Sequence, residues 1–146
     1  MMNYPQMYDY VMERALLNVT YDEATTEQQD VYRVLQFYSE MASGGFEGYI
    51  GWVLELLTEE QRKQSVEQLT MTLLEIGCKY MAQVVATHAW SLYMAAQSLQ
   101  HDEITEDDYV EELVVANDSY YAIEQQFAGD MQTFIAALYY GMKIGE

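Results

Sequence analysis

Hydrophobic positions recur with helical spacing along most of the chain, and the pattern is most continuous over residues 80–101. This stretch contains no Asp, Glu, Lys or Arg, although charged residues make up 21% of the sequence. Met81, Val85, Leu92 and Leu99 follow one another at intervals of four and seven residues, which places them on one face of a helix. The opposite face is also largely apolar, and a helix that is apolar all round is typical of a protein interior. We therefore expect a buried central helix here.

The same stretch is long enough to raise the question of a membrane span. At 1.5 Å per residue it would measure about 33 Å, which is enough to cross a bilayer. Polar residues such as Gln83, Thr87 and Ser91 recur along it, however, and no basic segment flanks it to set an orientation. We expect no membrane partner.

A glycine pair marks the clearest predicted corner between two helices. Gly44 and Gly45 should end one helix, because glycine readily adopts the positive φ that a C-terminal cap requires. The helical period begins again at Phe46, and we expect its side chain to pack into the core at this corner.

Two further boundaries are predicted in the second half of the chain. Thr105 and Asp108 have the spacing of an N-terminal capping pair, and the polar residues 117–119 predict a break before a last helix. No segment has the two-residue alternation of a strand. Residues 1–146 therefore predict a single all-α domain, a bundle of about six to nine helices around residues 80–101.

Negative charge is the dominant feature of the composition. The formal net charge is −18, and residues 102–130 contain ten carboxylates with no Lys or Arg. The dipole of a helix favours acidic residues in its first turn, which explains only part of this run. We expect a partner-binding acidic face that is formed by Asp102, Glu103, Glu106, Asp107, Asp108, Glu111, Glu112 and Asp118.

The charge also limits the classes of partner. Nucleic acid and anionic membranes would be repelled, so a basic protein is the expected partner. The single cysteine, Cys78, cannot form an internal disulfide, and the N-terminus lacks the pattern of a secretory signal peptide. We expect a cytoplasmic protein.

Residues with catalytic or metal-binding chemistry are few. The two histidines, His88 and His101, form no Glu-x-x-His pair, and His88 is expected to be a core residue bonded to a neighbour. Glu103-x-x-Glu106 is similar to the metal-binding carboxylates of all-helical nucleotide pyrophosphatases, but no second acidic motif accompanies it. We expect no enzyme activity, no catalytic residues, no metal and no cofactor.

The corner at residues 40–49 carries a resemblance to a known family. The segment with Glu40, Ser43, Gly44, Gly45, Phe46 and Tyr49 resembles the Glu-x-x-Asn-Gly-Gly-Phe-x-Gln-Tyr/Phe-Phe signature of a bacterial all-helical family of unknown function. Residues 73–78 and 117–124 are similar to two further segments of that family. Ser43, Gly48 and Ile50 depart from the signature.

The resemblance implies a function as well as a fold. The family includes a DNA mimic protein, and membership would imply a homodimer. Gly44, Gly45, Phe46 and Tyr49 would be structural residues of the motif.

Three functions are consistent with this sequence. The first is an acidic, DNA-mimicking interaction protein that occupies the nucleic-acid-binding surface of a basic partner such as a transcription factor. The second is an immunity or antitoxin protein that binds a toxin through carboxylates around an apolar centre, for which the pairs Tyr120-Tyr121 and Tyr139-Tyr140 are candidates. The third is a soluble helical protein of unknown role whose charge only keeps it in solution.

Overall fold

The computed structural model describes residues 3–17 and 25–145, and every regular element in this part of the chain is helical. In chain order the elements are α1 (Tyr4–Met12), the π-helical turn η1 (Glu13–Leu17), α2 (Thr26–Leu56), α3 (Glu59–Glu75), α4 (Lys79–Gln100) and α5 (Glu106–Gly145). The all-α prediction is confirmed. The described residues form five α-helices, fewer than the six to nine expected, because two predicted boundaries do not separate helices.

The predicted glycine corner is a kink inside α2 rather than a loop between two helices. Gly45 has φ 61° and ψ −155°, and it is the one residue with non-helical torsions within α2. This region of backbone space is accessible essentially only to glycine. The chain therefore changes direction at a single residue, and Phe46 and Tyr49 follow it into the core with 0% and 1% of their surfaces exposed.

The predicted break at residues 117–119 is wrong, since α5, which is 40 residues long, continues through them without interruption. The amide of Asn117 does not cap a helix. Its Oδ1 accepts a hydrogen bond from the backbone N–H of Phe46 over 3.0 Å. A polar side chain that suggests a helix end in the sequence is therefore used for a contact between α2 and α5.

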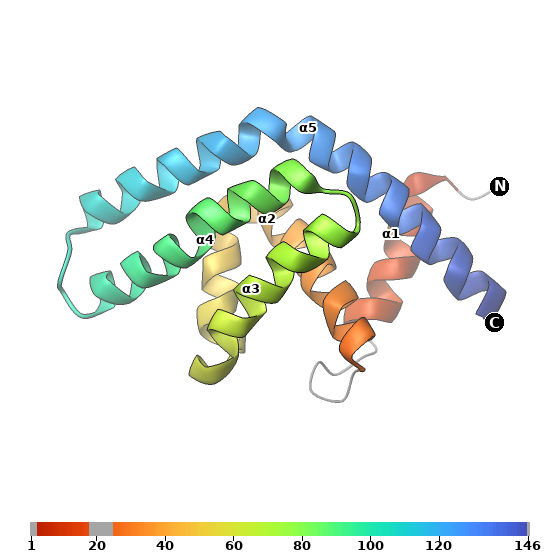
Figure 1. The fold of residues 1–146 in the computed structure, drawn as a ribbon, viewed down its shortest axis with the longest axis horizontal. Helices are drawn as coiled ribbons and strands as arrows, with labels where there is room; N and C mark the ends of the chain where they lie inside the picture. The colour runs from red at the N-terminus through yellow and green to blue at the C-terminus, as the bar shows by residue number, and fades with distance from the viewer. Residues whose placement is uncertain (1–2, 18–24, 146) are drawn as a thin grey trace.

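The helix α4 is not enclosed on all sides, so the expected buried central helix is not confirmed. Ala89 and Val85 are fully buried, but Tyr80 and Met94 on the outer face are 50% and 47% exposed. Figure 1 shows α4 between α3 and α5, with one face left open. The lack of charge on this helix suggested burial, but the outer face is built from neutral side chains that water tolerates, including Gln83.

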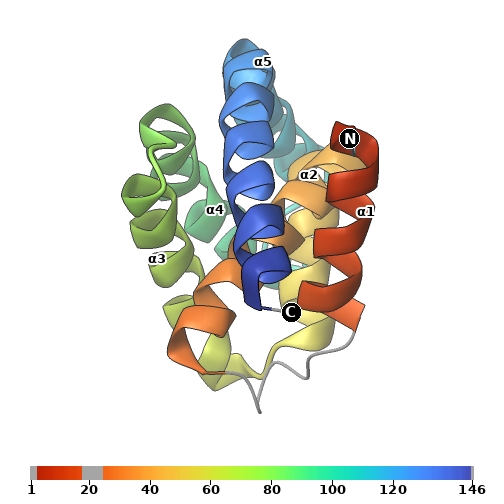
Figure 2. The ribbon, with the colours of Figure 1, turned by 90° about the vertical axis from the view of Figure 1, so that its right-hand side faces the viewer.

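The long helix α5 joins the two sides of the molecule. Its N-terminal half lies beside α4, and its C-terminal half crosses α1 (Figure 1). Figure 2 shows α1 and α3 on opposite sides of α5. Buried residues from all five helices form one core, in which α2 contacts α3, α4, α5 and η1.

The kink provides a matched pair of glycine substitutions. A Cβ on Gly45 would lie 2.8 Å from Oδ1 of Asn117 and would require a positive φ, whereas a Cβ on Gly44 meets nothing within 4 Å. We expect Gly45→Ala to lower the free energy of unfolding by about 3 kcal/mol. Gly44→Ala should raise it by about 0.5–1 kcal/mol, because glycine is a poor helix former.

Urea denaturation of the two variants and the wild type measures both effects. Equal midpoints for Gly45→Ala and the wild type would show that the kink does not depend on glycine.

Candidate functional site

The eight predicted acidic residues belong to one hairpin, which we call the acidic hairpin: the C-terminal half of α4, residues 101–105 and α5 as far as Asp118. Its tip projects from the left of the molecule in Figure 1. The turn at the tip is a Schellman motif, in which the N–H of Glu103 bonds to the carbonyl of Ser98 over 2.8 Å. Asp102 occupies the left-handed position with φ 57°, which Asp tolerates better than most residues.

The predicted capping pair at the start of α5 is present. The N–H of Asp108 donates to Oγ1 of Thr105, and the N–H of Thr105 donates to Oδ2 of Asp108, over 3.2 and 3.1 Å. Asp108 therefore has a structural role in addition to its charge. The first turn of α5 also contains Glu106 and Asp107, where the helix dipole stabilises negative charge.

All eight predicted carboxylate side chains are exposed, but they do not all point the same way. At 100° per residue, Asp107, Glu111 and Asp118 lie within roughly 40° of one another on the outer face of α5. Asp108 and Glu112 turn toward α4. Asp107, Glu111 and Asp118 therefore form an acidic ridge on α5, and Asp108 and Glu112 lie on the flank of this ridge that faces α4. The predicted residues do not form a single flat surface.

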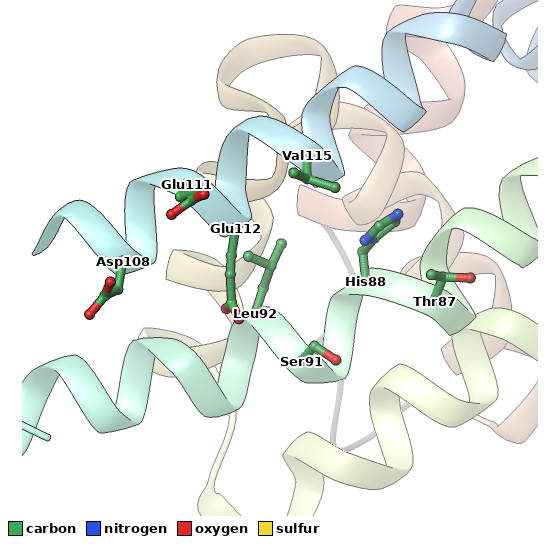
Figure 3. Close-up of a pocket in the computed structure, with 8 residues that line it drawn as sticks. All are labelled: Thr87, His88, Ser91, Leu92, Asp108, Glu111, Glu112 and Val115. Atoms are coloured by element: carbon green, nitrogen blue, oxygen red, sulfur yellow. The ribbon is translucent and has the colours of Figure 1, made fainter. Parts of the chain in front are cut away.

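An open cleft of about 540 Å³ lies between α4 and α5 on this flank (Figure 3). Three of the predicted carboxylates line it from α5, and Figure 3 shows Glu112 extending toward α4. Its lining residues are Thr87, His88, Ser91, Leu92, Asp108, Glu111, Glu112 and Val115. The sequence did not indicate that the neutral face of α4 would contribute to the acidic site.

His88 lies at the inner end of this cleft, half-buried. Its Nε2 is 3.1 Å from Oγ of Ser119, which confirms the expected bond to a neighbour. The expected core position is wrong, because His88 is only partly buried and lines the open cleft. The Ser119 hydroxyl also lies 3.2 Å from the carbonyl oxygen of Val115, one turn earlier on α5. Burial lowers the pKa of His88, which favours the uncharged imidazole. The histidine therefore does not neutralise the carboxylates of the cleft.

A further carboxylate, on α2, lies close enough to the acidic hairpin to influence Tyr109 of α5. Glu47 directly follows Phe46 at the kink, and its side chain is exposed. Burial raises the pKa of the Tyr109 hydroxyl, and the nearby charges of Glu47 and Glu112 raise it further. The only sequence signal for this placement is the position of Glu47 beside the corner phenylalanine.

The acidic hairpin itself contains no Lys or Arg, although Arg62 of α3 contacts it by donating from Nη1 to the hydroxyl of Tyr93 on α4 over 3.2 Å. No Lys or Arg lies between Lys79 and Lys143. Arg62 is held by the carbonyl oxygens of Leu54 and Leu57, and the buried Arg33 forms an ion pair with Asp30. The negative potential of the hairpin is therefore not reduced by an adjacent cation from its own helices.

The described residues contain no group of three or more His, Cys, Asp or Glu side chains that could hold a metal ion. Within the same ranges, no helix combines the length and the apolarity that a membrane span requires.

Comparison of the chain with family models, curated proteins and solved structures gave no match. The family resemblance and the functions that it implies therefore stay predictions.

The lowered pKa of His88 predicts how the stability of the fold depends on pH. The unfolded chain takes up a proton near the ordinary pKa of 6.5, whereas the folded state resists protonation. The free energy of unfolding therefore keeps its full value above that pH and decreases below it, because protonation of the histidine favours the unfolded chain. We expect the melting temperature of the wild type to fall relative to His88→Gln between about pH 7.5 and 5.5.

Both proteins carry Asp108, Glu111 and Glu112 in the cleft, so the titration of these groups largely cancels in the comparison. A difference of opposite sign would show that their attraction for the charged imidazole outweighs its burial.

The single cysteine generates a second prediction. Cys78 is 1% exposed, and burial, with a smaller contribution from Asp130, raises its pKa to about 11. Because the thiolate is the nucleophile, we expect iodoacetamide to leave the native protein unmodified near neutral pH and to modify it in urea. Mass spectrometry measures the extent of modification under both conditions. Rapid labelling of the native protein would contradict the buried thiol.

Proposed function

We propose that the chain is an acidic interaction protein that presents the acidic hairpin to a basic protein, and that it acts by binding rather than by catalysis. One observation carries this proposal. The carboxylates of the acidic hairpin are exposed, and the projecting helix segments that form this hairpin contain no Lys or Arg. A rigid pair of packed helices can hold such charges in fixed positions before the partner arrives, which lowers the cost of binding.

The spacing of the charges supports mimicry of DNA over a short length. Glu106, Asp107, Asp108, Glu111 and Glu112 fall within about 9 Å of helix axis, which is about one charge per 2 Å. Duplex DNA carries about one charge per 1.7 Å. The next carboxylate, Asp118, follows after another 9 Å or so. A nucleic-acid-binding surface of the partner, such as that of a transcription factor, would therefore be occupied over about three base-pair steps.

The immunity or antitoxin alternative needs an apolar centre in the contact. Each predicted tyrosine pair contributes one exposed ring to such a centre. Tyr121 and Tyr140 are 57% and 53% exposed, whereas Tyr120 and Tyr139 are 2% and 7% exposed and pack in the core.

A homodimer remains part of the proposal, at a different surface. Met71, Leu74 and Tyr80 are about half exposed on α3 and the start of α4. Contact between two copies here would keep their acidic hairpins apart, which reduces repulsion between two chains of charge −18.

A charge-matched pair of variants tests the function. The hairpin variant carries Asp102→Asn, Glu103→Gln, Asp107→Asn, Glu111→Gln and Glu112→Gln, and it keeps the capping residue Asp108. The control variant changes five exposed carboxylates of α2 and α3 to their amides: Glu55, Glu59, Glu60, Glu67 and Glu75. Both variants change the net charge from −18 to −13, since each loses five charges.

We expect the wild type and the control to capture the same basic nucleic-acid-binding protein from a native lysate, and duplex DNA and added salt to displace it. The hairpin variant should bind that protein about tenfold more weakly or worse. Equal losses in both variants would mean that net charge alone attracts the protein. Capture that persists in the hairpin variant and in high salt would favour the immunity-type alternative.

A further inference from the structure

An exposed apolar row runs beside the acidic ridge on the N-terminal half of α5. Val110, Val114 and Tyr121 are 47%, 53% and 57% exposed. At 100° per residue they lie within about 40° of one another, and they are separated by about 6 and 10 Å along the axis. They form one continuous strip on the side of α5 away from the cleft with α4.

The helix itself gives no reason for apolar residues in these positions. Valine is a weaker helix former than alanine or glutamate because its branched side chain loses rotamer freedom. Asn117 lies at a similar angle on α5 and contacts α2 at the kink, yet the three apolar side chains on either side of it stay half exposed. The row is therefore not part of the core.

The acidic ridge runs parallel to this row. Asp107, Glu111 and Asp118 lie next to it on the outer face of α5, so that one strip of apolar surface adjoins one strip of negative charge. Phosphates of DNA present no such apolar strip. A partner that covers both strips needs apolar side chains along one line and Lys or Arg side chains along the next.

We propose that these two strips bind a basic amphipathic helix of the partner protein, with its apolar face on Val110, Val114 and Tyr121 and its cations on Asp107, Glu111 and Asp118. The inference rests on the proposed function and names the partner segment. Charge complementarity selects this occupant. A second copy of the chain or an anionic membrane would be repelled, whereas a basic helix is attracted. Residues 107–121 span about 21 Å, which matches about four turns of a partner helix.

Two synthetic peptides serve as probes. The first is a helical peptide of Leu and Lys, about 18 residues long, with Leu at positions i, i+3, i+4 and i+7 of each repeat. The second has the same composition in an order that distributes Leu around the helix. Equal charge in the two peptides separates the apolar contribution from the electrostatic one. Isothermal titration calorimetry with the full chain measures both affinities.

Matched variants locate the contact. The row variant carries Val110→Thr, Val114→Thr and Tyr121→Gln. The control variant carries Leu56→Thr, Tyr140→Gln and Ile144→Thr, which alters three exposed apolar side chains, 53–87% exposed, on α2 and the C-terminal end of α5. Circular dichroism and thermal unfolding confirm that both variants keep the fold.

We expect the wild type and the control variant to bind the amphipathic peptide at least about tenfold more tightly than the rearranged peptide. The row variant should lose this preference and bind both peptides alike. Unchanged affinity of the row variant for the amphipathic peptide would overturn the inference, as would equal affinities of the wild type for the two peptides.

The amide variant of the acidic hairpin separates this inference from the proposed function. If it binds both peptides more weakly than its charge-matched control, the acidic hairpin attracts basic chains whatever the result for the row. If it binds them as tightly as that control, the proposed function fails first, and the inference fails with it.

Discussion

Asn117 and Phe46 join the two halves of the molecule through one hydrogen bond, from the backbone N–H of Phe46 to Oδ1 of Asn117. The kink at Gly45 interrupts the helical bonding of α2, and the amide of Asn117 supplies an acceptor for the N–H beside it. A half-buried N–H without a partner would cost about 1–3 kcal/mol. Gly45 supports the same contact, since a Cβ there would lie only 2.8 Å from the Asn117 oxygen and would displace it.

The consequences of this contact reach the acidic hairpin. It fixes the register of α5 against α2, so that Tyr120 and Phe127 enter the core while Asp107, Glu111 and Asp118 face outward. A rotation of α5 by one residue, or 100°, would turn the acidic ridge toward a neighbouring helix. The ring of Phe46 also lies 6.4 Å from that of His88, and His88 bonds to Ser119 on α5. The three helices α2, α4 and α5 thus meet at one junction behind the site.

Local chemistry explains which features could be predicted from sequence. The all-α fold, the corner at Gly45 and the pairing of Thr105 with Asp108 depend on residues close together in the chain, so their spacing reveals them. Asn117 could not be assigned in this way, because the same amide suits a helix cap and a contact with a distant backbone N–H. The exposure of the outer face of α4 could not be predicted for a related reason. Neutral residues such as Gln83 are compatible with burial and with water, and only the neighbouring helices decide between them.

The sequence indicated that the eight carboxylates would be exposed, but not the directions in which they point. All eight carboxylates are exposed, as a charged side chain without an oppositely charged partner must be. Their grouping into a ridge, a cleft and a parallel apolar row depends on the rotation of α5, which the junction at Asn117 sets. This arrangement changes the physical character of the surface. Charge alone would attract basic proteins with little discrimination, whereas in the proposed complex Val110, Val114 and Tyr121 beside the ridge would add contacts that salt does not screen. Electrostatic attraction would then govern how fast the proposed partner arrives, and the apolar row would govern which partner stays bound.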